Sequence, residues 1–101
     1  MKDLLIVEDD PTLGEGIRLA LQAPELRPQL CRSLADAGEL LSRRSFDLLI
    51  LDINLPDGNG LDLLRALRRE SEVPVILLTA NDLETDIVAG LEPVSYTHLT
   101  L

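Results

Sequence analysis

Aromatic residues are almost absent from this sequence, which has one Phe, one Tyr and no Trp among its 101 residues. The core must therefore be built mainly from Leu, Ile, Val and Ala, and a hydrophobic content of 46% supplies enough of them for one small domain. A single cysteine, Cys31, excludes an internal disulfide and fits a reducing compartment, where a lone Cys is commonly a small buried residue.

Long apolar runs are also absent, and basic residues are few. No run of about 18 apolar residues exists to span a bilayer, and the first residues lack the basic-then-apolar pattern of a signal peptide. The formal net charge of -9 argues against direct binding to nucleic acid or to an anionic membrane, since both require clustered Lys and Arg. We expect a cytoplasmic protein without membrane contact, whose acidic balance is compatible with a cation site or a basic partner surface.

Short apolar runs alternate with helical patterns along the chain. The strand patterns lie at residues 4–7, 27–31, 47–51 and 75–78, and the helical patterns at 11–23, 33–43, 60–69 and 82–89. Three strand patterns have the continuous hydrophobicity of strands buried on both faces of a parallel sheet, whereas the second is more polar, as in an edge strand. The order β-α-β-α-β-α-β-α predicts a doubly wound α/β sheet with right-handed crossovers.

Several polar residues have the positions of helix caps and turns. Asp10 precedes Pro11 and is interpreted as a helix cap rather than a metal ligand. Ser33 and Asn59 are predicted to cap the second and third helices. Asp57, within Pro-Asp-Gly, is interpreted as a turn residue.

Acidic residues follow two of the predicted strands. Glu8 and Asp9 come directly after the first strand, and Asp52 ends the third. The carboxyl ends of parallel strands meet at one edge of the sheet, where ligands bind, and crowded carboxylates repel and raise one another's pKa. A divalent cation explains such crowding, and carboxylates with a backbone carbonyl and water suit Mg²⁺ or Mn²⁺. Asp52 is then placed to attack phosphorus and form an acyl phosphate.

Three ordered motifs resemble those of the receiver domain of two-component response regulators. They are Ile-Val-Glu8-Asp9-Asp10, then Leu-Ile-Leu-Asp52-Ile-Asn-Leu-Pro-Asp-Gly-Asn-Gly60, then Pro74-Val-Ile-Leu-Leu-Thr79-Ala80. The resemblance covers residues 2 to about 92 and is closest to the branch that carries a winged-helix DNA-binding domain. It implies a flavodoxin-like fold with strand order 2-1-3-4-5.

The resemblance also assigns a phosphorylation site and a metal site. Asp52 matches the residue that a sensor histidine kinase phosphorylates. Glu8 and Asp9 match the acidic pair that holds magnesium, with Asp52 and the backbone carbonyl of Asn54 completing the protein ligands.

Other residues match the family's switch and its loop. Thr79, which by itself is equally well read as a strand-end threonine, matches the hydroxyl residue that reports the phosphoryl group. Pro56 and Gly60 match the loop that shapes the site. The family is a switch rather than an enzyme, catalysing at most its own phosphoryl transfer, and it acts on an effector, here one for transcription. The resemblance implies homodimerisation through the fourth-helix face, and DNA contact only through an effector domain absent from this chain.

The C-terminal segment departs from the family. The family's lysine falls near residue 101, which is Leu101, and Lys2 is the chain's single lysine. His98 stands near the family's strand-5 aromatic. We expect an incomplete receiver over 1–92, an atypical tail at 93–101 that is truncated or chimeric, and a missing or replaced fifth strand and helix. Either the fourth strand keeps an exposed apolar edge, or the tail pairs with it.

Two other functions are compatible with these residues. One is a receiver-like interaction module that is not phosphorylated, which would not respond to acetyl phosphate or beryllofluoride. The other is an aspartate-nucleophile phosphotransferase acting on small molecules. It would want a second acid two residues beyond Asp52, where this chain has Asn54.

Overall fold

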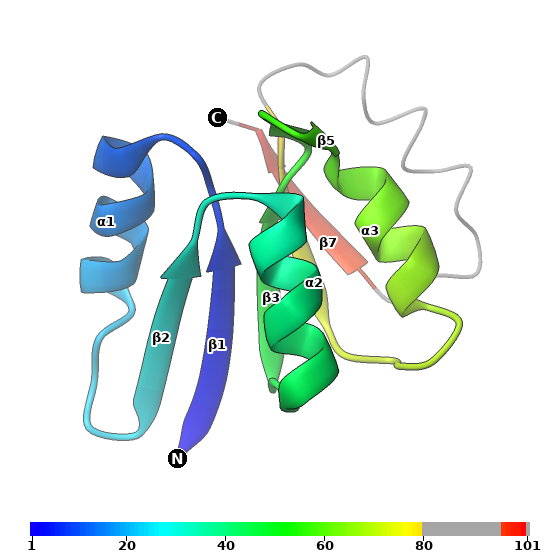
Figure 1. Ribbon diagram of the computed structural model, residues 1–101. Coiled ribbons are helices and arrows are strands. Elements are labelled where there is room, and N and C mark those ends of the chain that lie inside the picture. The colour runs from blue at the N-terminus through cyan, green and yellow to red at the C-terminus, as the bar shows by residue number, and fades with distance from the viewer. Residues whose placement is uncertain (80–95, 101) are drawn as a thin grey trace.

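The protein folds around a parallel five-stranded sheet, seen in a computed structural model that describes residues 1–79 and 96–100 (Figure 1). The strands are β1 (Lys2–Val7), β2 (Leu26–Cys31), β3 (Leu48–Asp52), β6 (Val75–Thr79) and β7 (Tyr96–Thr100), in the order β2-β1-β3-β6-β7. Every neighbouring pair is parallel. This order confirms the doubly wound, flavodoxin-like sheet, because the second strand lies at one edge and chain order reverses at β1.

Three helices connect the strands within the described part of the chain. They are α1 (Pro11–Ala20), α2 (Leu34–Arg43) and α3 (Gly60–Leu67). Each begins at the predicted cap: Asp10 accepts from the amides of Thr12 and Leu13, Ser33 from that of Asp36, and Asn59 from that of Leu61. These side chains satisfy amides that a helix leaves without a partner in its first turn. The predicted helix at 82–89 lies outside the described residues. Among the described helices, none has the length and apolar content needed to cross a membrane.

Aliphatic side chains bury both faces of the sheet, as the shortage of aromatic residues requires. One face, which includes Leu5, Val7, Leu49 and Leu51, packs against α2 and α3, and Leu61 and Leu64 of α3 belong to the same core. The other face includes Ile6, Ile50 and Leu78, against which Ile17 and Leu21 of the α1 segment pack. Successive strand residues alternate between these faces, and burial on both sides is typical of a parallel sheet.

The tail supplies a fifth strand. Residues of β7 pair in parallel with β6, from Val75 opposite Tyr96 to Thr79 opposite Thr100. Of the two outcomes expected for this edge, the exposed one is therefore wrong and the paired one is confirmed. The β-branched and aromatic residues of Tyr96–Thr100 favour an extended chain despite their atypical sequence.

A short hairpin lies between β3 and α3, where only a turn was predicted. Strands β4 (Asn54–Leu55) and β5 (Gly58–Asn59) pair antiparallel, with Pro56 and Asp57 at the turn. Gly58 has a φ of +152°, a conformation open to glycine at little cost. The hairpin matters for function because it starts two residues after Asp52.

Candidate functional site

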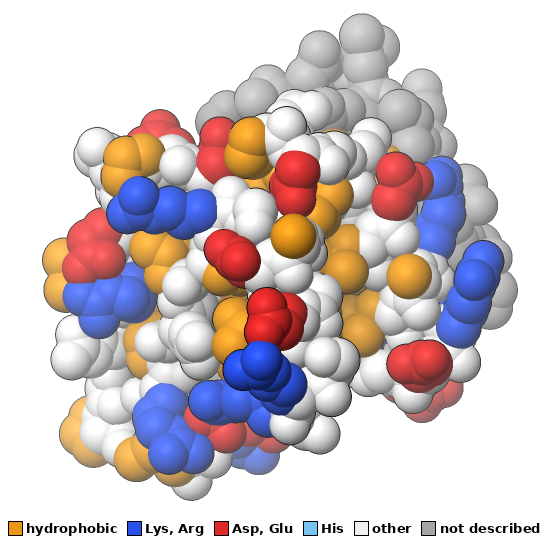
Figure 2. Space-filling view, in the orientation of Figure 1, with side chains coloured by type: hydrophobic (Ala, Val, Ile, Leu, Met, Phe, Trp, Pro, Cys, Tyr) orange, Lys and Arg blue, Asp and Glu red, His pale blue; other side chains and the backbone are white. Residues whose placement is uncertain are grey.

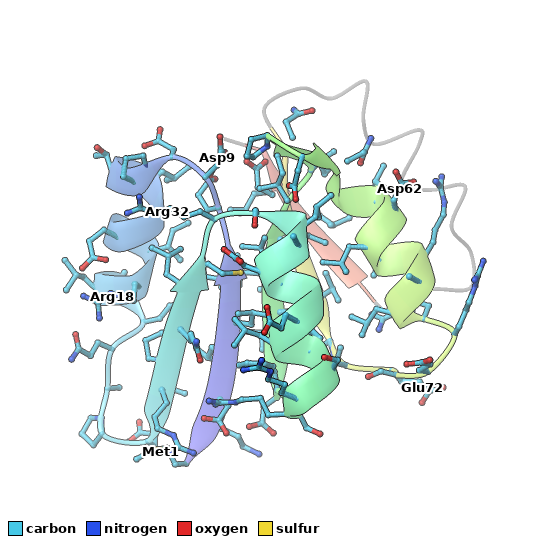
Figure 3. The ribbon with its side chains drawn as sticks, viewed as in Figure 1. Met1, Asp9, Arg18, Arg32, Asp62 and Glu72 are labelled. Atoms are coloured by element: carbon cyan, nitrogen blue, oxygen red, sulfur yellow. The ribbon has the colours of Figure 1, made fainter. Side chains whose placement is uncertain are left out.

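The acidic residues that follow β1 and end β3 converge at the carboxyl edge of the sheet. β1 and β3 are neighbours, and Val7 lies opposite Leu51, so Glu8 follows at the level of Asp52. One carboxylate oxygen each from Glu8, Asp9 and Asp52 lie within 4.8 Å of one another. Figure 3 shows Asp9 on the connection between β1 and α1, at the upper rim of the sheet. The predicted convergence of separate acidic segments is confirmed.

Glu8 is the buried member of this trio. Only 2% of it is exposed, and its carboxylate accepts a hydrogen bond from the backbone amide of Asp10 at 3.0 Å. Burial, followed by the neighbouring charge of Asp52, raises the pKa of Glu8 to about 7. Burial beside a second acid therefore disfavours the charged form of Glu8.

Asp52 is half-buried and shares a hydrogen bond with Glu8. Burial is the main cause that raises the pKa of Asp52, while the bond from Glu8 and the Asn54 amide, which donates to Asp52 Oδ1 at 3.2 Å, oppose the rise. The bond lowers the pKa of Asp52 and raises that of Glu8, so it favours the proton on Glu8 over the proton on Asp52.

The predicted loop residues lie on the segment that follows Asp52. Gly60 opens α3 so close to β3 that a Cβ atom there would lie 2.3 Å from the backbone oxygen of Asp52. This contact gives the predicted loop-shaping role of Gly60 a physical basis, because every other residue carries a Cβ. Pro56 is exposed at the hairpin turn. Leu78 lies opposite Asp52, and Thr79 follows it as the last residue of β6. The side chain of Thr79 lies outside the described structure.

Two other aspartates have structural roles. Asp10 caps α1 through Oδ1, at 2.9 Å from the amide of Thr12 and 3.2 Å from that of Leu13, as predicted. Asp57 stands in the hairpin turn as expected, but its carboxylate also accepts hydrogen bonds from the first two amides of α2. The sequence gives no signal for this contact, because residues more than 20 positions apart form it.

Acidic and basic side chains are interspersed over the face seen in Figure 2, with a group of basic ones at its lower left. The amino end of β1 lies at the lower end of the sheet (Figure 1). Lys2 begins β1 at that lower end, so about 20 Å of strand, at roughly 3.3 Å per residue, separates it from Glu8. Within the described residues no ion pair involves Glu8, Asp9 or Asp52. Three oxygen donors without a protein cation fit a hard divalent metal ion.

Comparisons with known proteins agree with this geometry. The family profile of the response regulator receiver domain matches residues 4–100. Response regulator protein PmrA of Pseudomonas aeruginosa is 43% identical over 98 residues, which are 96% of this chain and 44% of that protein. The KDP operon transcriptional regulatory protein KdpE of Escherichia coli is 41% identical over 96 residues, covering 91% of this chain and 41% of the relative. The chain thus spans less than half the length of these relatives.

Solved structures share the fold. The BeF3-activated receiver domain of Klebsiella pneumoniae RstA superposes with a TM-score of 0.82 at 33% identity, covering 98% of this chain and 86% of that one. The receiver domain of a Pseudomonas aeruginosa sensor histidine kinase, with a magnesium ion coordinated in its active site cleft, has a TM-score of 0.82 at 27% identity and covers 98% and 84%. The parallel sheet, the acidic rim and the matched length together show that this chain belongs to the response regulator receiver domain family, whose members are phosphorylation-controlled switches.

Proposed function

We propose that Asp52 is the phosphoryl acceptor of this receiver domain and that a sensor histidine kinase is the donor. The observation that carries the proposal is the meeting of Glu8, Asp9 and Asp52 within 4.8 Å at the carboxyl edge of the sheet. Crowding of this kind opposes folding unless a ligand or a proton offsets it, which favours a functional site.

The metal site proposed here consists of Glu8, Asp9, Asp52 and the backbone carbonyl of Asn54. The fit to Mg²⁺ or Mn²⁺ rests on the donors themselves, which are hard oxygens, and on the buried position of the Glu8 carboxyl group beside Asp52. When bound, the ion supplies positive charge that offsets the carboxylates and orients the phosphoryl oxygens. Asp9 is the exposed member of the three acids.

In the proposed transfer, a carboxylate oxygen of Asp52 attacks the phosphorus of a phosphohistidine. The new P–O bond forms an acyl phosphate while the P–N bond breaks, and its electron pair stays on the imidazole nitrogen, which takes up a proton. With a small phosphodonor, the domain catalyses the same transfer to its own Asp52. The Asn54 amide, already donating to Asp52 Oδ1 at 3.2 Å, helps hold the nucleophile.

The output of the switch is proposed by analogy with the family. Thr79 reports the phosphoryl group, Pro56 and Gly60 keep the loop in place, and two conformations of the domain redistribute. A face at the fourth helix serves homodimerisation. PmrA is named a response regulator and KdpE a transcriptional regulatory protein, so we propose a cytoplasmic regulator that contacts DNA through an effector domain outside this chain.

The shortage of lysine sets a limit on this activity. Lys2 is the chain's single lysine and lies at the opposite end of β1 from the acidic rim. Among the described residues no lysine lies at the acidic rim, so we expect phosphotransfer and switching by this chain to be weak.

Beryllofluoride binding tests the proposal. In the presence of Mg²⁺, the full chain should bind beryllofluoride in a ¹⁹F NMR titration, and acetyl phosphate should slowly add one phosphoryl group detectable by mass spectrometry. Asp52→Asn should abolish both signals while keeping the fold, since the amide cannot act as the nucleophile. Failure of both ligands at the wild-type chain would favour a non-phosphorylated interaction module. Repeated turnover of a phosphate ester would favour a phosphotransferase.

A further inference from the structure

The turn of the β4–β5 hairpin is attached to a helix that is distant in sequence. Asp57 Oδ1 accepts from the backbone amide of Leu34 at 2.9 Å, and Asp57 Oδ2 accepts from that of Ala35 at 3.0 Å. These are the first two residues of α2. A carboxylate at this place also interacts favourably with the helix dipole, and both bonds hold the pKa of Asp57 below its usual range.

Packing holds the same turn against the same helix. A Cβ atom at Gly58 would lie 2.8 Å from Leu34 Cδ1, so the hairpin backbone and the start of α2 are in direct contact. Leu55, on the other strand of the hairpin, is buried in the core that lies under α2 and α3. The hairpin therefore rests on α2 through both a polar and an apolar contact.

The base of the hairpin is attached to the acidic site. The Asn54 amide donates to Asp52 Oδ1 at 3.2 Å, and the Gly60 amide donates to the Ile53 carbonyl at 2.7 Å. Asn54 also pairs with Asn59, the residue that caps α3. The hairpin thus connects two places in the fold: its base lies beside Asp52, and its turn lies on the first residues of α2.

We propose that Asp57 is a positioning residue for the acidic site: its carboxylate holds the hairpin tip on α2 and thereby fixes the backbone of Asn54 beside Asp52. The proposal rests on the proposed function, because the Asn54 carbonyl has a role only if a cation binds there. The hydrogen bonds of the Asp57 carboxylate go to the start of α2, not to the three acids of the rim, so it acts through the hairpin backbone. Groups behind the first ligands commonly set metal affinity in this way.

The simpler explanation is that Asp57 only stabilises α2. The chain offers a matched control, because Ser33 caps the same helix end: Ser33 Oγ accepts from the Asp36 amide at 3.2 Å. Ser33→Ala removes a cap from α2 without touching the hairpin, whereas Asp57→Ala removes a cap and frees the hairpin tip. Asp57→Asn removes the charge but keeps one amide oxygen as an acceptor, which separates positioning from a loss of negative charge near the metal.

The first measurement is amide hydrogen exchange in the metal-free chain. In Asp57→Ala, we expect the amides of Asn54 and Asn59 to exchange about tenfold faster, as the loss of one or two hydrogen bonds predicts. In Ser33→Ala these two amides should exchange at the wild-type rate. Equal exchange of both amides in all three proteins would overturn the proposal.

The second measurement is Mg²⁺ affinity by calorimetry on the same proteins. Asp57→Ala should raise the Kd for Mg²⁺ by about tenfold, Asp57→Asn should lie closer to wild type, and Ser33→Ala should stay within about twofold. Equal Kd values for Asp57→Ala and Ser33→Ala, or for Asp57→Ala and Asp57→Asn, would show that helix stability or charge alone accounts for the effect. If the wild-type chain bound no Mg²⁺ while the exchange result held, the hairpin contact would stand and the proposed function would fail.

Discussion

Acidic residues lie at both ends of the sheet, but only at the amino end do they form ion pairs with arginine among the described residues. At the amino end, Asp3 lies 2.9 Å from Arg27 Nε and 3.0 Å from Arg44 Nη2, and the Arg44 guanidinium lies 4.7 Å from the centre of the Phe46 ring. At the carboxyl end, Glu8, Asp9 and Asp52 meet with no described ion pair. The charge of Asp3 is already offset by two arginines. The three acids at the carboxyl end have no described arginine or lysine partner, and they can still bind a cation.

The backbone shows a second difference between the ends. At the amino end, the contacts are between side chains, as in the Asp3–Arg27 pair, in which Arg27 is exposed and Asp3 is mostly buried. At the carboxyl end, backbone touches backbone, because Gly60 lies against the Asp52 carbonyl. We therefore expect changes to the carboxyl-end backbone to be costly, and changes to the amino-end pairs to be mild.

The largest expected effect is that of Gly60→Ala. A Cβ atom 2.3 Å from a backbone oxygen forces β3 and α3 apart, and we expect a loss of about 3 kcal/mol in the free energy of unfolding, measured by urea denaturation. Gly16→Ala is the control, since no described atom lies within 4 Å of a Cβ there, and alanine should stabilise α1 by up to about 1 kcal/mol. A Gly60→Ala protein as stable as Gly16→Ala would refute the close approach.

Smaller effects are expected when one acid is neutralised at each end of the sheet: one change should weaken Mg²⁺ binding, and the other should lower stability. Asp9→Asn should weaken Mg²⁺ binding by at least about tenfold without lowering metal-free stability, because it removes a ligand and a repulsive charge. Asp3→Asn should lower stability by at most about 1 kcal/mol, less so at high salt, since its arginine partners are substantially exposed. Calorimetry and urea denaturation of both proteins measure the pair of effects. If Asp3→Asn weakened Mg²⁺ binding as much as Asp9→Asn, the two ends would not be distinct.

Much of this architecture follows from local sequence. The buried runs at β1, β3 and β6 are apolar enough to be recognised, and the caps Asp10, Ser33 and Asn59 act within three residues of themselves. The convergence of Asp9 and Asp52 follows from a topological rule, because parallel strands bring their carboxyl ends to one edge.

Other features depend on tertiary placement and could not be predicted. Asp57 was recognisable as a turn residue, but its hydrogen bonds to the amides of Leu34 and Ala35 depend on how the hairpin packs against α2. Glu8 and Asp9 are adjacent acids in the sequence, yet one is buried and the other exposed. Burial, which only the packed structure determines, is what raises the pKa of Glu8.

The raised pKa of Glu8 gives metal-free stability a definite pH dependence. Its folded value of about 7 exceeds the ordinary value of 4.5, so the folded state binds more protons than the unfolded state between these pH values. The free energy of unfolding contributed by this group therefore falls as pH rises from 4.5 toward about 7. Mg²⁺ competes with the same proton, so metal affinity should rise over this range.

The most direct test is a Mg²⁺ titration of the full chain by calorimetry, from about pH 5.5 to about pH 8.5. We predict that affinity increases through pH 7 and levels off above it, with protons released on binding below that pH. Glu8→Gln should bind Mg²⁺ more weakly and with a flatter pH profile, because its amide carries neither the proton nor the charge. A wild-type affinity that did not change with pH, or that equalled the affinity of Glu8→Gln, would contradict a cation site built on these acids.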